Sequence, residues 1–509
     1  MSASENQSRP AASPRWHGLL AWLAAFICCA LALTSQSLWI DESYTALKAQ
    51  QTSLAGWWHE LLRAGGSDVQ MPLYMIWIWV CEKIVGSSEI ALRAANLFWI
   101  FPGFLALWFS LARRPQLRLA VFLVAVCNPF IWYYLNEARP YAMQIGASLF
   151  LAAALCRWSE KPFSPAAGES LWVWGFILAL LALSGASMLG MIWAGAAILA
   201  ALFLSPKERL LKLGRNYLFV WLAGLALLAV LGFYYLWTLK AGARASDAAT
   251  TDWKNVAFIG YELLGFAGLG PGRLELRDGG LQVFKAHAPL LGLFAALVLG
   301  LIIFAARDLL QNYPRQKILG LAVVVAAPAL FILGAGFAMH FRVLGRHFAP
   351  LLPVVVLLMG LGVTAAWRQG STGKILVVGF FALCLASGLS LRLAARHGKD
   401  DYRSAAGLAR AALTSGKCVW WSADAGAAAY YQLPVTTNSA VAGSALLLIN
   451  PPEELLPALV PADVVIVSRK DLYDPHSVIA GFVERNHFNQ SAVLPAFVVW
   501  EKPAAKTNR

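Results

Sequence analysis

Long apolar stretches separated by short polar loops are the main pattern along the chain from Gly18 to Leu391. Each stretch has roughly 17 to 25 residues, the length that an α-helix needs to cross about 30 Å of hydrocarbon. The run 71–86 is shorter and carries Glu82 and Lys83, so we expect a re-entrant or tilted element there rather than a full crossing. The pattern predicts a polytopic α-helical membrane protein with about 11 spans, within a range of roughly 10 to 13.

The pattern changes after Leu391. Short β-rich runs such as "DVVIVS" alternate with helix-like stretches such as "PHSVIAGFVERN", which is typical of a small α/β domain. We therefore divide the chain into a membrane domain of residues 1–391 and a soluble α/β domain of residues 392–509. Two longer polar segments, residues 38–70 and residues 239–286, interrupt the membrane domain and are expected to be external loops.

Composition and charge agree with this assignment and give an orientation. The chain is 59% hydrophobic and only 13% charged, with a mean hydropathy of +0.60, unlike a soluble domain. Much of the net charge of +14 lies in short basic loops between spans, such as those at Arg113, Arg307 and Arg368. Such loops face the cytoplasm, so the charge indicates membrane orientation and not nucleic-acid binding. The N-terminus is then cytoplasmic, and the C-terminal domain is extracytoplasmic.

Several charged residues of the membrane domain fall on the extracytoplasmic side in this orientation. The adjacent carboxylates Asp41 and Glu42 either mark the end of a span or act on a substrate head group at the membrane surface, where one of them could remove a proton from a hydroxyl. Asp68 either belongs to a polar loop or joins them. Glu137 and Arg139 either pair with each other or line a polar cavity.

A basic turn near the end of the membrane domain departs from the inside-positive rule. It contains Arg342, Arg346 and His347. Guanidinium groups match the oxygens of a phosphate, so this turn either binds a lipid phosphate or anchors the protein among lipid head groups. His340 and His347 lack a nearby third ligand, and no metal site is indicated. The sequence requires no cofactor, and a divalent metal ion is compatible with it but not indicated.

Five short motifs, taken in order, resemble the GT-C superfamily of glycosyltransferases. They are "WIDESYTA", "SDVQMPLY", "SEIALRAANLFWI", "YYLNEARPYAM" and "GRHFAPLLP". They are most similar to the family 39 type, which includes protein O-mannosyltransferases and the lipid A aminoarabinose transferase. The resemblance covers residues 17 to about 405, and "RHGKDDYRSAA" at its end resembles the junction to a soluble domain in bacterial members.

The resemblance implies an inverting glycosyltransferase of the bacterial cytoplasmic (inner) membrane. Its partners would be the bilayer, a polyprenyl-phosphate-linked sugar as donor, and a lipid, glycan or protein as acceptor, on the extracytoplasmic face. Asp41 would be the general base and Glu42 its catalytic partner. The motifs also imply a set of substrate-binding residues: Asp68, Tyr74, Arg93, Glu137, Arg139, Tyr141, Arg342, Arg346 and His347.

Two departures from the family pattern affect the identity of donor and acceptor. Many bacterial members have His-Pro-Pro-Leu where this chain has Gln70-Met71-Pro72-Leu73, and the turn "LSGASMLG" lacks a histidine often found there. Two other functions stay open: a transporter or flippase for a lipid-linked substrate, and a non-catalytic scaffold of a glycan assembly system. The transporter is disfavoured because the sequence shows no paired repeats with interrupted spans.

Overall fold

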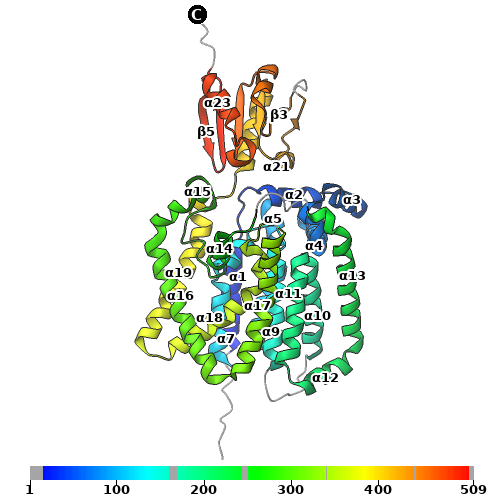
Figure 1. The fold of residues 1–509 in the computed structure, drawn as a ribbon, viewed down its shortest axis with the longest axis vertical. Coiled ribbons are helices and arrows are strands. Elements are labelled where there is room, and N and C mark those ends of the chain that lie inside the picture. Colours follow the sequence, from blue (N-terminus) through cyan, green and yellow to red (C-terminus); the bar gives the residue numbers. More distant parts are fainter. Residues whose placement is uncertain (1–14, 160–168, 244–249, 340, 439–442, 504–509) are drawn as a thin grey trace, which may run out of the picture.

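The computed structural model describes residues 15–159, 169–243, 250–339, 341–438 and 443–503. A bundle of long helices carries a small α/β unit at one end (Figure 1). The helices up to the end of the bundle are α1 (Arg15–Ala32), α2 (Ile40–Ala49), α3 (Leu54–Ala64), η1 (Gly66–Gln70), α4 (Pro72–Val85), α5 (Glu89–Ala94), α6 (Leu97–Ser110), α7 (Pro115–Val126), α8 (Pro129–Leu135), α9 (Tyr141–Ser159), α10 (Glu169–Ala186), α11 (Met188–Leu204), α12 (Lys207–Asn216), α13 (Leu218–Ala243), α14 (Trp253–Leu263), α15 (Arg273–Gly279), η2 (Gly280–Val283), α16 (Phe284–Asn312), α17 (Arg315–Ala338), η3 (Gly345–Leu351), α18 (Leu352–Trp367), α19 (Ser371–Leu393) and η4 (Ala395–His397).

Within the described residues, seven helical segments are long and apolar enough to cross a membrane, or eight if the bent pair α7 and α8 is one span. Two shorter apolar helices lie in α1 and α11. Helix α4 has 14 residues and rises about 21 Å, which is too short for a full crossing. The polytopic helical membrane fold predicted from the sequence is confirmed.

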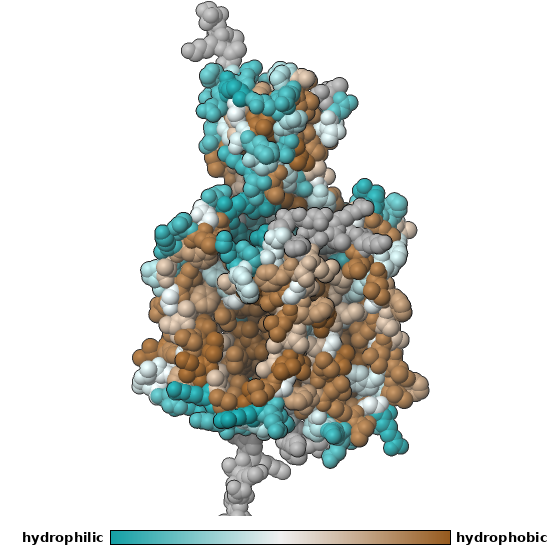
Figure 2. Space-filling model, viewed as in Figure 1, coloured by the Kyte–Doolittle hydropathy of each residue, from teal (hydrophilic) through white to brown (hydrophobic). Residues whose placement is uncertain are grey.

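The outer surface of the bundle is apolar, as a lipid-facing surface must be. Phe219 on α13 and Leu319 and Val323 on α17 are among its highly exposed side chains. Figure 2 shows this brown surface along the length of the bundle, with hydrophilic residues gathered at its two ends and over the α/β unit. The hydrophobic effect provides no drive between helices in lipid, so close packing must hold them together.

Small residues allow that close packing between α6 and α9. A Cβ atom added to Gly146 would lie 2.2 Å from the carbonyl oxygen of Trp99, and one added to Gly103 would lie 2.9 Å from the carbonyl oxygen of Gly146. The two helices therefore touch backbone to backbone, which only glycine permits at these positions. Helix α9 begins directly after the motif that carries Glu137 and Arg139, so this packing fixes the start of α9 in the bundle.

The α/β unit contains a six-stranded sheet with the strand order β2-β3-β1-β4-β6-β5. The first four strands in this order are parallel, whereas β6 is antiparallel to both β4 and β5. Its elements are α20 (Tyr402–Thr414), β1 (Val419–Ser422), α21 (Ala425–Tyr430), β2 (Val435–Thr436), β3 (Ala445–Leu447), η5 (Glu453–Ala458), β4 (Val464–Ser468), α22 (Lys470–Tyr473), α23 (Val478–Arg485), β5 (Asn489–Leu494) and β6 (Phe497–Glu501). This confirms the predicted C-terminal α/β fold.

Candidate active site

Helix α2 presents Asp41 at the end of the bundle that faces the α/β unit (Figure 1). The side chain of Asp41 is 35% exposed, and its Oδ2 lies 3.6 Å from Nη1 of Arg346. Its backbone carbonyl accepts hydrogen bonds from Thr45 Oγ1 (3.0 Å) and Arg139 Nη1 (3.3 Å). The backbone is thus held firmly while the carboxylate stays partly accessible.

Glu42, the next residue, points into the protein and is fully buried. Its carboxylate accepts two hydrogen bonds from Arg93, at 3.0 and 2.8 Å, one from Lys399 at 2.8 Å and one from the Ala138 amide at 2.8 Å. Burial alone would raise the pKa of Glu42, but Arg93 and Lys399 outweigh it and lower the pKa to about 2. Glu42 is therefore a buried, fully ionised centre of an ion-pair network.

Asp68 in η1 forms a second buried network. One oxygen lies 2.7 Å from Lys48 Nζ and the other 2.7 Å from Arg139 Nη1. Arg139 also donates to Thr45 Oγ1 at 2.9 Å, so the network joins η1 to α2 and to the start of α9. Burial would raise the pKa of Asp68, yet Arg139 and Lys48 lower it overall. This carboxylate is saturated by two cations.

Glu137 is buried, but its carboxylate is largely unpaired. Neither carboxylate oxygen accepts a well-aligned hydrogen bond from another described residue, although the Tyr133 hydroxyl interacts with this carboxylate. Oε1 lies 3.8 Å from Nη1 of Arg273 in α15. The Arg273 guanidinium lies 4.6 Å from the ring centre of Tyr133 and 5.8 Å from that of Trp39, and its side chain is 46% exposed. Glu137 thus has free acceptor capacity beside a half-exposed cation.

Of the two arginines in the basic turn, Arg346 lies beside the other site residues, whereas Arg342 does not. The Arg346 guanidinium lies 5.5 Å from the ring centre of Tyr141 as well as beside Asp41. His347 accepts a hydrogen bond from the Leu344 amide through Nδ1 (3.2 Å), which shapes the turn. Arg342 is exposed, and no described hydrogen bond or ion pair joins it to the other site residues. His340 lies outside the described residues.

Glu262 on α14 is a further carboxylate that the sequence did not single out. A Cβ atom on Gly345, the residue before Arg346, would lie 1.9 Å from its Oε2. Burial raises the pKa of Glu262 to about 7, although Arg273 and Arg346 oppose this rise. The segment 239–286 therefore supplies both Glu262 and Arg273 to the site.

Arg93 and Tyr74, two of the predicted substrate-binding residues, are both fully buried, but they differ in their hydrogen bonds. Arg93 donates to the carbonyl oxygens of Thr34, Gln36 and Ser37 besides Glu42, so all of its charge is used within the protein. The hydroxyl of Tyr74 on α4 has no hydrogen-bond partner among the described residues. Tyr74 is therefore available to a ligand only if the ligand reaches the interior.

Lys48, Lys399, Arg273 and Glu262 are the residues that the sequence analysis missed. Lys48 follows Asp41 by seven residues, and side chains at this spacing share a helix face, so a local signal for it existed. Glu262 lies on α14, Arg273 lies on α15 and Lys399 lies beyond the last span, and nothing local in the sequence connects them to Asp41. Among the described residues, no group of three or more His, Cys, Asp or Glu side chains could hold a metal ion.

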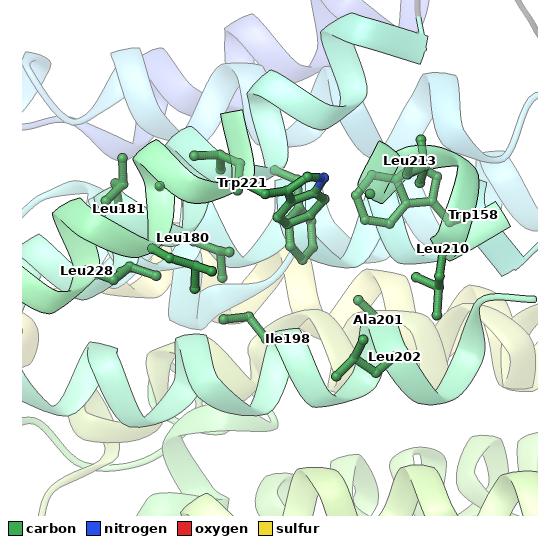
Figure 3. A pocket seen from close by; sticks show the side chains of 15 residues that line it. Trp158, Leu180, Leu181, Ile198, Ala201, Leu202, Leu210, Leu213, Trp221 and Leu228 are labelled. Carbon is green, nitrogen blue, oxygen red and sulfur yellow. The ribbon is translucent and has the colours of Figure 1, made fainter. Parts of the chain in front are cut away.

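An apolar pocket of about 240 Å³ lies between α10, α11, α12 and α13, with the end of α9 beside it (Figure 3). Trp158, Trp221, Leu180 and Leu213 are among its lining residues. Helix α12 lies at the end of the bundle opposite α2 (Figure 1), so this pocket is remote from the charged residues around Asp41. Its lining suits a hydrocarbon chain and not a sugar.

No protein-family model matches the chain, and no curated protein does. Solved structures do. ArnT from Cupriavidus metallidurans in the apo state matches with a TM-score of 0.51 at 12% identity, over 96% of this chain and 98% of that chain. ArnT bound to undecaprenyl phosphate gives a TM-score of 0.49 at 12% identity, over 97% and 99% of the two chains. The arabinofuranosyltransferase AftD from Mycobacteria gives 0.44 at 13% identity, over 96% of this chain and 40% of its own. The apo ArnT match shows that this chain shares the overall fold of that polytopic protein.

Proposed function

We propose that this protein is an inverting glycosyltransferase that moves a sugar from a polyprenyl-phosphate carrier to an acceptor hydroxyl. One observation carries the proposal: Asp41 keeps a partly exposed carboxylate beside Arg346, whereas its neighbour Glu42 and nearby Asp68 are buried and saturated. A general base needs a free, accessible carboxylate. The GT-C fold and the sequence motifs support the reaction class.

The reaction follows from this geometry. Asp41 removes the proton of the acceptor hydroxyl as its oxygen attacks the anomeric carbon of the sugar. The bond from that carbon to the phosphate oxygen breaks on the opposite side, which inverts the configuration, and the electron pair leaves with the polyprenyl phosphate. Arg346 and Arg273 are the cations placed to stabilise the phosphate charge, and an activated phosphate donor requires no nucleotide site.

The remaining residues are assigned four roles. Glu137 has unused acceptor capacity and is assigned to sugar hydroxyl groups, with Tyr133 and Trp39 nearby as stacking surfaces. Arg93, Arg139, Glu42 and Asp68 use their charges within the protein and are assigned a positioning role. Tyr141 and His347 are assigned to orienting Arg346, and Arg342 to attraction of the anionic donor from outside.

We further propose that the site faces the extracytoplasmic side of the bacterial inner membrane and that the N-terminus is cytoplasmic. The basic loops that follow α6, α16 and α18 support this orientation because such loops stay in the cytoplasm. We also propose a division near residue 391. The separate buried cores of the sheet unit support it.

The experiment compares Asp41→Asn with Glu60→Gln, a carboxylate substitution on α3 in the same external segment. Membranes of each variant are followed for loss of polyprenyl-phosphate-linked sugar and for gain of product. We expect Asp41→Asn to reduce transfer by about 10²- to 10⁴-fold, with the Glu60→Gln variant close to wild type. Thermal stabilisation by undecaprenyl phosphate is measured in parallel and should persist in Asp41→Asn.

Normal transfer by Asp41→Asn would overturn the catalytic assignment. A flippase or transporter would move lipid-linked sugar across the bilayer without covalent product. The lipid-linked pool would then stay chemically intact in the wild type, in Asp41→Asn and in Glu60→Gln. A scaffold would show neither transfer nor stabilisation by undecaprenyl phosphate. The two measurements together therefore distinguish the enzyme from both alternatives.

A further inference from the structure

The C-terminal α/β unit contacts the peptide on both sides of Asp41. Ile40, the preceding residue, packs against the buried core of the α/β unit. Tyr44, one helical turn later, donates a hydrogen bond from its hydroxyl to Asp424 Oδ2 (3.3 Å), and its ring lies against Gly426. Helix α2, which presents the proposed base Asp41, therefore belongs to the membrane domain by sequence, but it packs against the core of the α/β unit.

Tyr431 holds the peptide that leads into α2. Its hydroxyl accepts hydrogen bonds from the Leu38 amide (2.7 Å) and from Ser37 Oγ (3.1 Å), and it donates to Glu89 Oε1 (3.2 Å). One phenol oxygen thus joins the α/β unit to two separate segments of the membrane domain. Because Leu38 precedes α2, its amide would otherwise need another acceptor.

Lys399 enters the membrane domain from the link between α19 and α20. Its ammonium group lies 2.8 Å from Glu42 Oε2 and donates to the Asn136 carbonyl oxygen at 2.6 Å. Burial and nearby Arg93 lower the pKa of Lys399 to about 8, although Glu42 favours the charged form. The Lys399 side chain is only 12% exposed and joins Glu42 to the peptide at Asn136. We therefore interpret it by the position that it fixes, because a desolvated ion pair contributes little net stability.

We propose that the α/β unit completes the active site, with Lys399 and Tyr431 as positioning residues that hold Asp41 in its productive orientation. Lys399 fixes Glu42 and the peptide before Arg139, and Tyr431 fixes the start of α2. No described hydrogen bond or ion pair from the α/β unit reaches the Asp41 carboxylate itself. The unit acts through the backbone and leaves the carboxylate open. The effect on turnover rests on the proposed transferase function.

The test uses the full-length protein with the substitutions Lys399→Met and Tyr431→Phe. Displacing a catalytic group by about 1 Å can lower a rate by about 10²-fold, so we expect Lys399→Met to lower kcat by about 10- to 100-fold. The KM for the polyprenyl-linked donor should change little, because neither residue contacts the proposed phosphate site. Tyr431→Phe removes one hydroxyl and should lower kcat about fivefold, as expected for one hydrogen bond.

Lys417→Met is the matched control, because Lys417 lies in the same unit and forms an exposed pair with Glu501 at 3.3 Å. It should keep the wild-type kcat. Rates are normalised to folded protein. A kcat within twofold of wild type for both Lys399→Met and Tyr431→Phe would overturn the proposal, as would equal losses in all three variants.

Hydrogen exchange of residues 37–45 gives a readout that does not depend on activity. These amides should exchange faster in Lys399→Met and Tyr431→Phe than in wild type, while those of α6 stay protected. If the wild type shows no transfer but exchange still rises in the two variants, the proposed function fails and the positioning role stands. Unchanged exchange in both variants would refute the positioning role even if transfer is confirmed.

Discussion

Arg93→Met should strongly destabilise the protein. The Arg93 guanidinium is fully buried and makes two hydrogen bonds to Glu42. It also satisfies the carbonyl oxygens of Thr34, Gln36 and Ser37. Methionine fills much of the same volume but provides no donor, so four acceptor groups lose a partner while Glu42 stays buried.

Two independent estimates give the size of the effect. Removing one member of a buried ion pair costs about 3–5 kcal/mol. The lowering of the Glu42 pKa from 4.5 to about 2 corresponds to about 3 kcal/mol of preference for its ionised form. Lys399 and the Ala138 amide remain on Glu42, whereas the three carbonyl groups add to the loss. We therefore expect a decrease of about 3 kcal/mol or more in the free energy of unfolding.

The assay is denaturant unfolding of purified protein in detergent, with Glu42→Gln and the double variant completing a mutant cycle. Because the two side chains contact each other, the double variant should be less destabilised than the sum of the single variants by about 2 kcal/mol. Arg63→Met is the control, since Arg63 pairs with Glu60 on the exposed face of α3 and should show no measurable change. Additive losses in the cycle, or an Arg93→Met effect no larger than the control, would refute the reasoning.

Three further changes test other parts of the site and the bundle. Burial raises the pKa of Glu262 to about 7, so the stability that its protonated form contributes is complete below pH 4.5 and is lost as the pH rises through 7. Glu262→Gln should therefore remove this fall in stability when Tm is measured over a series of pH values. An unchanged pH profile of Tm would contradict the prediction. Gly146→Ala should lower Tm, with an overpacking cost of about 1–3 kcal/mol, because its Cβ would lie 2.2 Å from the Trp99 carbonyl oxygen; an unchanged Tm would show that α6 and α9 can separate freely. Arg273→Met should weaken stabilisation by undecaprenyl phosphate about tenfold or more in apparent affinity, and equal affinity would exclude Arg273 from the proposed phosphate site. The Tm of the ligand-free protein should also fall, because buried Glu137 loses the cation 3.8 Å away.

The helices were predictable because the bilayer sets their length and composition. Apolar runs of the required length coincide with the long helices. Helix α4 in the run 71–86 has 14 residues, and its placement as a re-entrant or tilted element stays a prediction. The C-terminal strands also appeared as short β-rich runs. The bend between α7 and α8 was not foreseen, although Asn128 and Pro129 mark it: the Asn128 side chain accepts hydrogen bonds from the Phe130 and Ile131 amides and starts a new helix.

For the charged residues around Asp41, the sequence predicted a common face of the membrane but not their contacts with one another. Orientation by basic loops gave Asp41, Glu137 and Arg346 a common side, but it carries no information on distances within that side. Lys399 is 357 residues from Glu42 along the chain, and its contact with Glu42 depends on how the α/β unit docks. Periodicity and local spacing report on neighbours within one helix, so this type of contact is outside their reach.

The different environments of Asp41 and Glu42 also depend on contacts between distant segments. Adjacent residues of an α-helix point about 100° apart, so the sequence already implied that the two carboxylates face different surroundings. It could not say which one faces inward, because Arg93 and Lys399 come from other segments. Once those cations surround Glu42, its charge is fully neutralised within the protein, and Asp41 is left as the carboxylate with room for a substrate hydroxyl. The proposed base is thus selected by the partners of its neighbour.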